Sequence, residues 1–244
     1  MNSAVCRSSL IFWISAALVG GALTGRAGEV QQEAQGGDKG PRAAPKYALS
    51  PGLGSMRTGL FGVTAEGYKF VYCFDRSGSM GGSGRNALRL VKTELLASLD
   101  RLDSVHQFQI IFYNERPLIF NPTGVPGRLA FATEQNKQRA RRFIESIVAD
   151  GGTEHEQALR LAIKMRPDVI FFLSDGDEPR LTRQQLDTIR RLAAGITICT
   201  IEFGSGPKPA GKSFLQLLAE ENGGQYAYVD ILEPAVSEDG QEKR

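Results

Sequence analysis

Three short stretches of this sequence place carboxylates and hydroxyls where the chain must turn. Asp75, Ser77 and Ser79 stand in the segment Asp-Arg-Ser-Gly-Ser-Met, Thr153 follows two glycines, and Asp175 stands between a serine and a glycine. All five side chains offer hard oxygen atoms, which suit Mg²⁺, Ca²⁺ or Mn²⁺ rather than zinc or copper. The residue types therefore predict a divalent-metal site, provided that the fold brings the three stretches together.

The elements between these stretches predict how they meet. Apolar runs typical of strands lie at 69–75, 107–113, 168–174, 196–203 and 225–229, with a shorter one at 116–120. Helical patterns lie at 86–102, 134–149, 153–164, 182–195 and 214–222, and Thr182 with Gln185 fits a capping box. This alternation predicts an α/β, Rossmann-like, doubly wound and mostly parallel sheet flanked by helices. Ligands of such sheets bind beyond the carboxyl ends of the strands, where two predicted strands end in Asp75 and Asp175.

Each candidate residue also has an ordinary structural interpretation. Ser77 could be a plain turn residue, and Asp175 with the following glycine is a common turn pair. Thr153 with Glu156 fits a capping box at the start of a helix. Taken together, these interpretations leave the convergence of three polar loops on one sheet edge unexplained, which favours the metal site.

The same residues carry a resemblance to a known family. The segment Asp75–Met80 resembles the Asp-x-Ser-x-Ser motif of the von Willebrand factor A family, and Thr153 and Asp175 follow in the order and at the separations usual there. The resemblance spans roughly residues 66–230. It implies the von Willebrand factor A fold, with Ser77, Ser79 and Thr153 binding the cation directly and Asp75 and Asp175 acting mainly through water.

The resemblance further implies a metal-ion-dependent adhesion site that binds Mg²⁺, with Mn²⁺ or Ca²⁺ as alternatives. Mg²⁺ takes about six oxygens and usually keeps some waters, so three hydroxyls leave its shell incomplete. Family members leave one position for an acidic side chain of a partner. We therefore expect a protein partner that offers a carboxylate to the metal.

Two enzymatic interpretations are weaker. Gly206–Ser213 matches the phosphate-binding loop pattern letter for letter. Such a loop presents backbone N–H groups to phosphates, and Pro207 and Pro209 have none to present. A catalytic serine is not indicated either, since Ser77 breaks the Gly-x-Ser-x-Gly pattern around Ser79 and no histidine–acid pair is evident. The sequence therefore predicts a binding protein and not an enzyme.

The ends of the chain predict export and flexible segments. Residues 1–27 combine a basic start, an apolar run of 14 residues from Leu10 to Leu23 and small residues before position 28, as in a signal peptide or, alternatively, an uncleaved membrane anchor. Residues 28–56 and 233–244 have few large apolar groups and are predicted to be a disordered linker and tail. The predicted domain is 57–232.

The composition limits the classes of partner. Arg7 and Arg26 lie in the predicted export segment, and without them basic and acidic residues are equal in number, 27 each. Neither nucleic acid nor an anionic membrane surface is therefore indicated as a partner. Contact with a membrane is expected only through the N-terminal segment.

The cysteines and histidines lack the spacing of a zinc site. Cys73 and Cys199 each lie in a strand-like run, and in the family's strand order one strand separates them. That places them about 10 Å apart, which is too far for a disulfide, so we predict free thiols. His106 and His155 are expected to be ordinary surface residues.

Taken together, the sequence predicts a non-enzymatic, metal-dependent adhesion or scaffold module that acts outside the cytoplasm or is anchored to a membrane. One alternative is an accessory subunit of an ATPase or metal-insertion complex whose ATPase is another chain. The other alternative is a structural domain of the same fold that binds no metal.

Overall fold

The computed structural model describes residues 54–81, 87–176 and 179–232, which all lie within one compact unit, Lys46–Arg244. The predicted export segment, the predicted tail and residues 28–53 of the predicted linker lie outside this described part of the chain. Among the residues that the structure describes, no helix is both long and apolar enough to cross a membrane.

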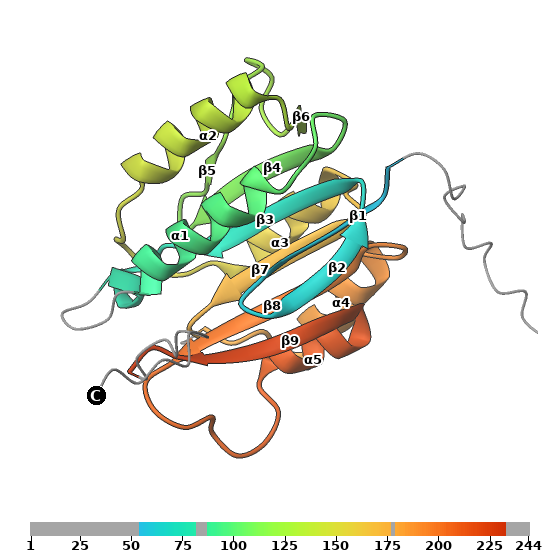
Figure 1. The fold of residues 1–244 in the computed structure, drawn as a ribbon. Coiled ribbons are helices and arrows are strands. Elements are labelled where there is room, and N and C mark those ends of the chain that lie inside the picture. Colours follow the sequence, from blue (N-terminus) through green and yellow to red (C-terminus); the bar gives the residue numbers. More distant parts are fainter. Residues whose placement is uncertain (1–53, 82–86, 177–178, 233–244) are drawn as a thin grey trace, which may run out of the picture. The chain divides into compact units, whose positions relative to one another are not determined.

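A seven-stranded sheet forms the centre of the domain. Its parallel strands are β3 (Lys69–Asp75), β4 (Gln107–Tyr113), β7 (Val169–Ser174), β8 (Thr197–Gly204) and β9 (Gly223–Asp230). Two short strands, β5 (Leu118–Ile119) and β6 (Ala130–Phe131), pair with β4 in the antiparallel direction. The order across the sheet is β5-β4-β3-β7-β8-β9, with β6 beside β4 (Figure 1). The predicted mostly parallel α/β sheet is confirmed.

Both faces of this sheet are covered. One face carries α1 (Ala87–Asp100) and α2 (Glu134–Ser146), and the other carries α3 (His155–Lys164), α4 (Arg183–Leu192) and α5 (Phe214–Glu221) (Figure 1). Along β7, Phe171 packs into the hydrophobic cluster on the face with α1 and α2, and Phe172 packs into the cluster on the face with α3, α4 and α5. A parallel strand covered on both sides needs apolar residues on both, which explains the nearly unbroken apolar run of β7.

The helix boundaries differ slightly from the predicted ones. α2 ends at Ser146, three residues earlier than predicted, because Ile147 adopts an extended conformation. α3 begins at His155, and its N-cap residue Glu154 makes no capping hydrogen bond through its side chain. The predicted capping box of Thr182 with Gln185 at the start of α4 is confirmed.

The connections place a crevice between β3 and β7. After β3 the chain passes through α1 on one face to β4, whereas after β7 it passes through α4 on the opposite face to β8. The two neighbouring strands thus send the chain in opposite directions. Open α/β sheets bind ligands at such a switch point, beyond the carboxyl ends of the strands. Asp75 ends β3 at this point, and Asp175 directly follows β7.

A hairpin that the sequence analysis did not predict completes the face that carries α1. It consists of β1 (Met56–Leu60) and β2 (Val63–Gly67), joined by Phe61 and Gly62, which both have positive φ angles of 50° and 77°. A two-residue turn of this kind suits the twist of antiparallel strands. Leu60 and Val63 are buried in the core, and the Phe61 ring packs edge-on against Phe203 of β8 at 5.2 Å.

A buried hydroxyl cluster ties the hairpin to the domain. Ser98 Oγ of α1 lies 2.9 Å from Tyr72 Oη of β3 and 3.0 Å from Thr58 Oγ1 of β1. Burial raises the pKa of Tyr72 to about 12, although the hydrogen bonds with Ser98 and Thr58 lower it. The three hydroxyls therefore form a neutral network that joins β1, α1 and β3.

Replacement of Ser98 by alanine is expected to lower the free energy of unfolding by about 1–3 kcal/mol, because it deprives two buried hydroxyls of a shared partner. Urea unfolding at neutral pH measures this change. The exposed Ser104 offers a matched control, since Ser104→Ala should change stability by less than about 0.5 kcal/mol. Equal effects of the two substitutions would contradict the role of the cluster.

The two described cysteines are free and buried, as predicted. Cys73 lies on β3 and Cys199 on β8, and β7 separates these strands. Their side chains also belong to the clusters on opposite faces of the sheet. Burial raises the pKa of both thiols, and for Cys73 the nearby Asp75 raises it further.

Candidate metal site

Asp75 lies at the bottom of the crevice with no solvent exposure. Its Oδ1 accepts a hydrogen bond from the backbone N–H of Ser77 at 2.7 Å, and its Oδ2 accepts one from Ser174 Oγ at 2.8 Å. The first bond folds the loop after β3 back over the strand end, and the second joins β3 to β7. Asp75 is thus held rigidly between the two strands of the switch point.

The two serines of the motif lie together above Asp75. Ser77 Oγ and Ser79 Oγ are 3.1 Å apart, and Ser77 is nearly buried whereas Ser79 is partly exposed. The short 3₁₀ helix η1 (Gly78–Gly81) follows the first serine, and its fully buried Met80 anchors the loop in the core. The paired hydroxyls therefore present two oxygens next to each other, of which that of Ser79 is the more exposed.

Asp175 and Thr153 come to the same edge from other loops. Ser174, whose hydroxyl binds Asp75, also accepts a hydrogen bond from Gly176 N at 3.1 Å, which curls the chain around the partly exposed Asp175. Thr153 belongs to the loop before α3, which is joined to the serine loop by a hydrogen bond from Gly78 N to Gly151 O at 3.0 Å. Thr153 is partly exposed and lies before the N-cap residue of α3, so the capping-box alternative for Thr153 is wrong.

The electrostatics of Asp75 suit a nearby cation. Burial raises the pKa of Asp75 from 3.8 to about 6, against the lowering effect of its hydrogen bonds with Ser77 and Ser174, and the neighbouring Asp175 raises it further. Without a positive charge, the ionised carboxylate is therefore destabilised where it stands. A divalent cation among the hydroxyls would compensate for that cost, so the donor set fits a hard metal ion.

The candidate metal site at this edge consists of mixed oxygen donors. Within the described ranges, no group of three or more His, Cys, Asp or Glu side chains is placed to hold a metal ion. The edge between β3 and β7 instead combines two carboxylates with the hydroxyls of Ser77, Ser79 and Thr153. Ser77, Ser79 and Thr153 would hold the ion, which would supply an open coordination position for an acidic ligand.

A partly open cavity of about 210 Å³ adjoins the site. Its lining includes the polar Ser79 and Asp175 and the apolar Ala87, Phe203 and Ile231. The candidate ligands are thus accessible from a hollow with mixed polar and apolar walls.

Both described histidines are buried, so their predicted surface position is wrong. His155 is 2% exposed, its Nδ1 lies 2.9 Å from Tyr113 Oη, and its ring packs against Phe172 and Phe214. His106 is 1% exposed and hydrogen-bonds to the carbonyls of Gly54 and Asp103. Each imidazole is hydrogen-bonded to protein atoms, which makes its burial tolerable.

The loop that matches the phosphate-binding pattern has other contacts. It connects β8 to α5, and Ser213 Oγ caps α5 while it also donates to Glu202. Lys212 Nζ lies 2.6 Å from a carboxylate oxygen of Glu220. The lysine and serine that would face a nucleotide are therefore engaged with α5 and β8.

Three residues that shape this edge were not predicted from the sequence: Ser174, Arg76 and Asn114. Ser174 bridges Asp75 and Gly176, and the only signal for it was its place at the end of an apolar run. Arg76 and Asn114 join the loops around the site through contacts 36 to 74 residues away in sequence, so no local pattern could reveal them.

Comparison with known proteins places the chain among domains of one type. The family model described as von Willebrand factor type A domain matches residues 71–228. The human inter-alpha-trypsin inhibitor heavy chain H4 is 27% identical over 204 residues, which cover 72% of this chain and 20% of that protein. The chain thus spans about a fifth of the length of this curated relative.

Solved structures agree on the fold. A von Willebrand factor type A structure from Catenulispora acidiphila has a TM-score of 0.57 at 21% identity and covers 68% of this chain and 40% of that one. Proximal thread matrix protein 1 from the mussel byssus, described with a zinc-occupied MIDAS motif, has a TM-score of 0.51 at 18% identity and covers 67% and 41%. With the family match spanning more than half of its length, the chain belongs to the von Willebrand factor type A domain family.

Proposed function

We propose that this chain is a non-enzymatic protein-binding module that holds Mg²⁺ at Asp75, Ser77, Ser79, Thr153 and Asp175 and binds an acidic side chain of a partner through that ion. The observation that carries the proposal is the buried Asp75 carboxylate beneath a pair of serine hydroxyls, at the switch point of the sheet and beside an accessible cavity. Mn²⁺ and Ca²⁺ are alternative cations for the same hard oxygens.

The division of roles follows from charge. Two carboxylates offset the charge of a divalent ion, whereas neutral hydroxyls in direct contact leave the ion attractive to a further anion. A partner carboxylate would replace a bound water, since Mg²⁺ usually keeps several waters. The zinc-occupied motif described for the mussel protein supports a divalent cation at this place in the fold.

The proposal includes a location outside the cytoplasm. The apolar segment Leu10–Leu23 would direct the chain there, either as a signal peptide or as a membrane anchor. Mass spectrometry of the mature N-terminus in the native host tests this part. Cleavage after residue 27 or retention in the membrane fraction would support it, and an intact chain in the cytosol would contradict it.

Water-proton relaxation with Mn²⁺ bound in place of Mg²⁺ tests the open coordination position. A short glutamate-containing peptide should lower the relaxation enhancement, because its carboxylate displaces a water from the metal, whereas the matched glutamine peptide should not. Thr153→Ala should abolish the difference. Equal responses to both peptides in the Mn²⁺-loaded protein would contradict an acidic partner at the metal.

A further inference from the structure

Three loops around the candidate site are joined by backbone hydrogen bonds. In the serine loop, residues 76–79 after β3, Arg76 O accepts a hydrogen bond from Asp150 N at 2.9 Å. Gly78 N of the same loop donates to Gly151 O at 3.0 Å. Arg76 N donates to Tyr113 O at the end of β4 (2.8 Å). The loop that carries Thr153 is therefore attached to the loop that carries Ser77 and Ser79, and the latter is attached to β4.

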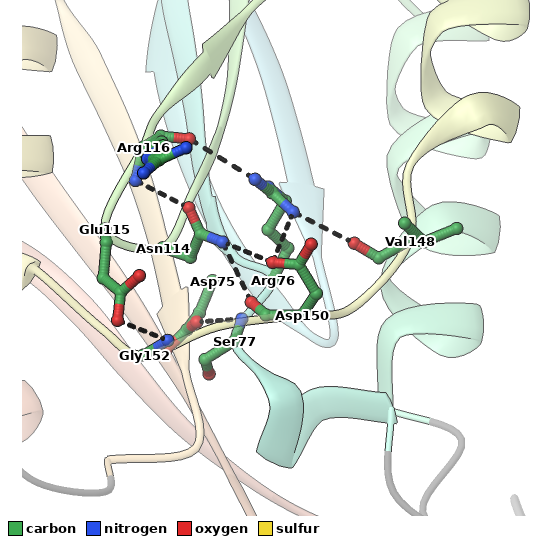
Figure 2. A network of polar contacts seen from close by, with 9 residues as sticks. All are labelled: Asp75, Arg76, Ser77, Asn114, Glu115, Arg116, Val148, Asp150 and Gly152. Carbon is green, nitrogen blue, oxygen red and sulfur yellow. Dashed lines mark hydrogen bonds and ion pairs between the residues drawn. The ribbon is translucent and has the colours of Figure 1, made fainter.

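The Arg76 side chain also links the loop before α3 to the loop after β4. It is only 8% exposed, and Figure 2 shows its guanidinium between the loop after β4 and the loop before α3. Nη1 donates to Val148 O at 3.3 Å and to Asp150 Oδ1 at 3.4 Å, and Nη2 donates to Arg116 O at 3.4 Å. One rigid, planar group thus spans two loops, which a flexible single ammonium does not do.

Asn114 fastens the same two loops at a second point. It is 3% exposed, and its Nδ2 donates to Asp150 O at 2.9 Å and to Asp150 Oδ1 at 2.8 Å (Figure 2). Its Oδ1 accepts from Arg116 N at 2.7 Å. The amide nitrogen of Asn114 therefore holds the loop before α3 against the loop after β4, and its oxygen fixes the turn within the latter loop.

The loop before α3 depends on such support. Between the end of α2 and the start of α3, residues 147–154 form neither helix nor strand, and Gly151 has a φ of +72°. A Cβ at Gly151 would lie 2.9 Å from Asn114 Nδ2, and one at Gly152 would lie 2.6 Å from Glu115 Oε1, which accepts from Gly152 N at 3.1 Å. The two glycines let Asn114 and Glu115 approach this closely, directly before Thr153.

We propose that Arg76 and Asn114 are positioning residues that set the place of Thr153 relative to Ser77 and Ser79, and so set the affinity of the site for a divalent cation. The inference rests on the proposed metal-binding function. Neither side chain has a hydrogen bond to Ser77, Ser79 or Thr153 among its bonds to described residues. Both act by fixing Asp150, three residues before Thr153 and bonded to the serine loop through Arg76 O.

A double-mutant cycle on Mn²⁺ affinity, measured by electron paramagnetic resonance of free Mn²⁺ with the full chain, tests this role. Asn114→Ala and Arg76→Lys should each weaken Mn²⁺ binding about 10-fold, as is typical for residues that orient metal ligands. In the Thr153→Ala background, Asn114→Ala should weaken binding less than about twofold, since the residue that it positions is already gone. If Asn114→Ala folds poorly, Arg76→Lys takes its place in the same cycle.

Matched controls separate positioning from general destabilisation. Asn222→Ala removes an amide that bonds Leu218 O at the end of α5, and Arg183→Lys alters an arginine paired with Asp187 and Glu221 on the surface. Both controls should leave Mn²⁺ affinity unchanged. In the metal-free Asn114→Ala protein, amide hydrogen exchange should rise at Gly78 and Asp150, the two N–H groups that join the loops.

The outcomes distinguish failure of the proposed metal-binding function from failure of the positioning role. Absence of Mn²⁺ binding by the unsubstituted chain would overturn the proposed function, and the positioning role with it. Binding that is weakened by Thr153→Ala but unaffected by Asn114→Ala and Arg76→Lys would overturn only the positioning role. Equal losses from Asn114→Ala with and without Thr153 would also overturn it, because the effect would then not pass through Thr153.

Discussion

Replacement of Asp75 by asparagine is expected to weaken Mg²⁺ binding more than 100-fold, on the order of a lost charged group at a metal site, and at the same time to stabilise the metal-free protein. Asparagine can keep the hydrogen bond from Ser77 N and can donate to Ser174 Oγ, while it removes a buried negative charge. The two effects have opposite signs because the buried carboxylate strengthens cation binding but destabilises the folded protein when no metal is bound.

The gain in stability should depend on pH. The pKa of Asp75 is raised from 3.8 to about 6, chiefly by burial. Between these values the folded chain holds a proton that the unfolded chain releases, so the wild-type stability falls as pH rises through that window. The advantage of Asp75→Asn should therefore be small at pH 4, grow up to pH 6 and level off above it at about 3 kcal/mol at most.

Urea unfolding at a series of pH values with chelator, together with calorimetric Mg²⁺ titration, measures both effects. Asp168→Asn is a matched control, because Asp168, like Asp75, accepts two hydrogen bonds, in its case from the backbone N–H groups of Tyr68 and Lys69, but lies at the opposite edge of the sheet. It should leave Mg²⁺ binding unchanged. An Asp75→Asn protein that is less stable than the wild type at pH 7.5 would contradict this account of the site.

Removal of the β1–β2 hairpin is expected to destabilise the domain by about 5 kcal/mol. A chain of residues 68–232 retains the whole span matched by the family model but loses the buried Leu60 and Val63 and the Phe61 contact with Phe203. Burial of each such side chain contributes about 1.5–3 kcal/mol. Because domains are typically stable by only about 5–15 kcal/mol, the shortened chain should be marginally folded.

The comparison is between chains 54–232 and 68–232 in urea, with near-ultraviolet circular dichroism as a probe of packing. Leu60→Ala in the longer chain should reproduce part of the loss, about 2–5 kcal/mol. Equal urea midpoints of the two chains would contradict this prediction, because they would show that the hairpin does not stabilise the domain and that exposing the sheet face beneath it to water costs no stability.

The parts of the fold that could be predicted from sequence are those with a strong local signal. The runs of β3 and β7 are nearly all apolar; β3 ends in Asp75 and β7 is directly followed by Asp175, so both the central strands and the polar edge could be predicted from them. The capping box of α4 lies within four residues. The hairpin was missed because its strands are five residues long and mix glycine, threonine and charged residues with few apolar ones.

The interpretations that depended on distant partners were less reliable. His106 binds Gly54, 52 residues earlier, and His155 binds Tyr113, 42 residues earlier. Neither contact leaves a trace in the local sequence, so both histidines resembled surface residues. The same reason hides Arg76 and Asn114, whereas the five candidate ligands could be named because the family motif marks them one by one.

Calorimetric titration of Mg²⁺ and Mn²⁺ into residues 54–232, beside Asp75→Ala and Thr153→Ala variants shown to be folded, tests the central claim most directly. The account predicts saturable one-to-one binding that both substitutions weaken strongly. No binding by the unsubstituted protein, even with a glutamate-rich peptide present to complete the coordination of the ion, would contradict it and would leave a structural domain of this family.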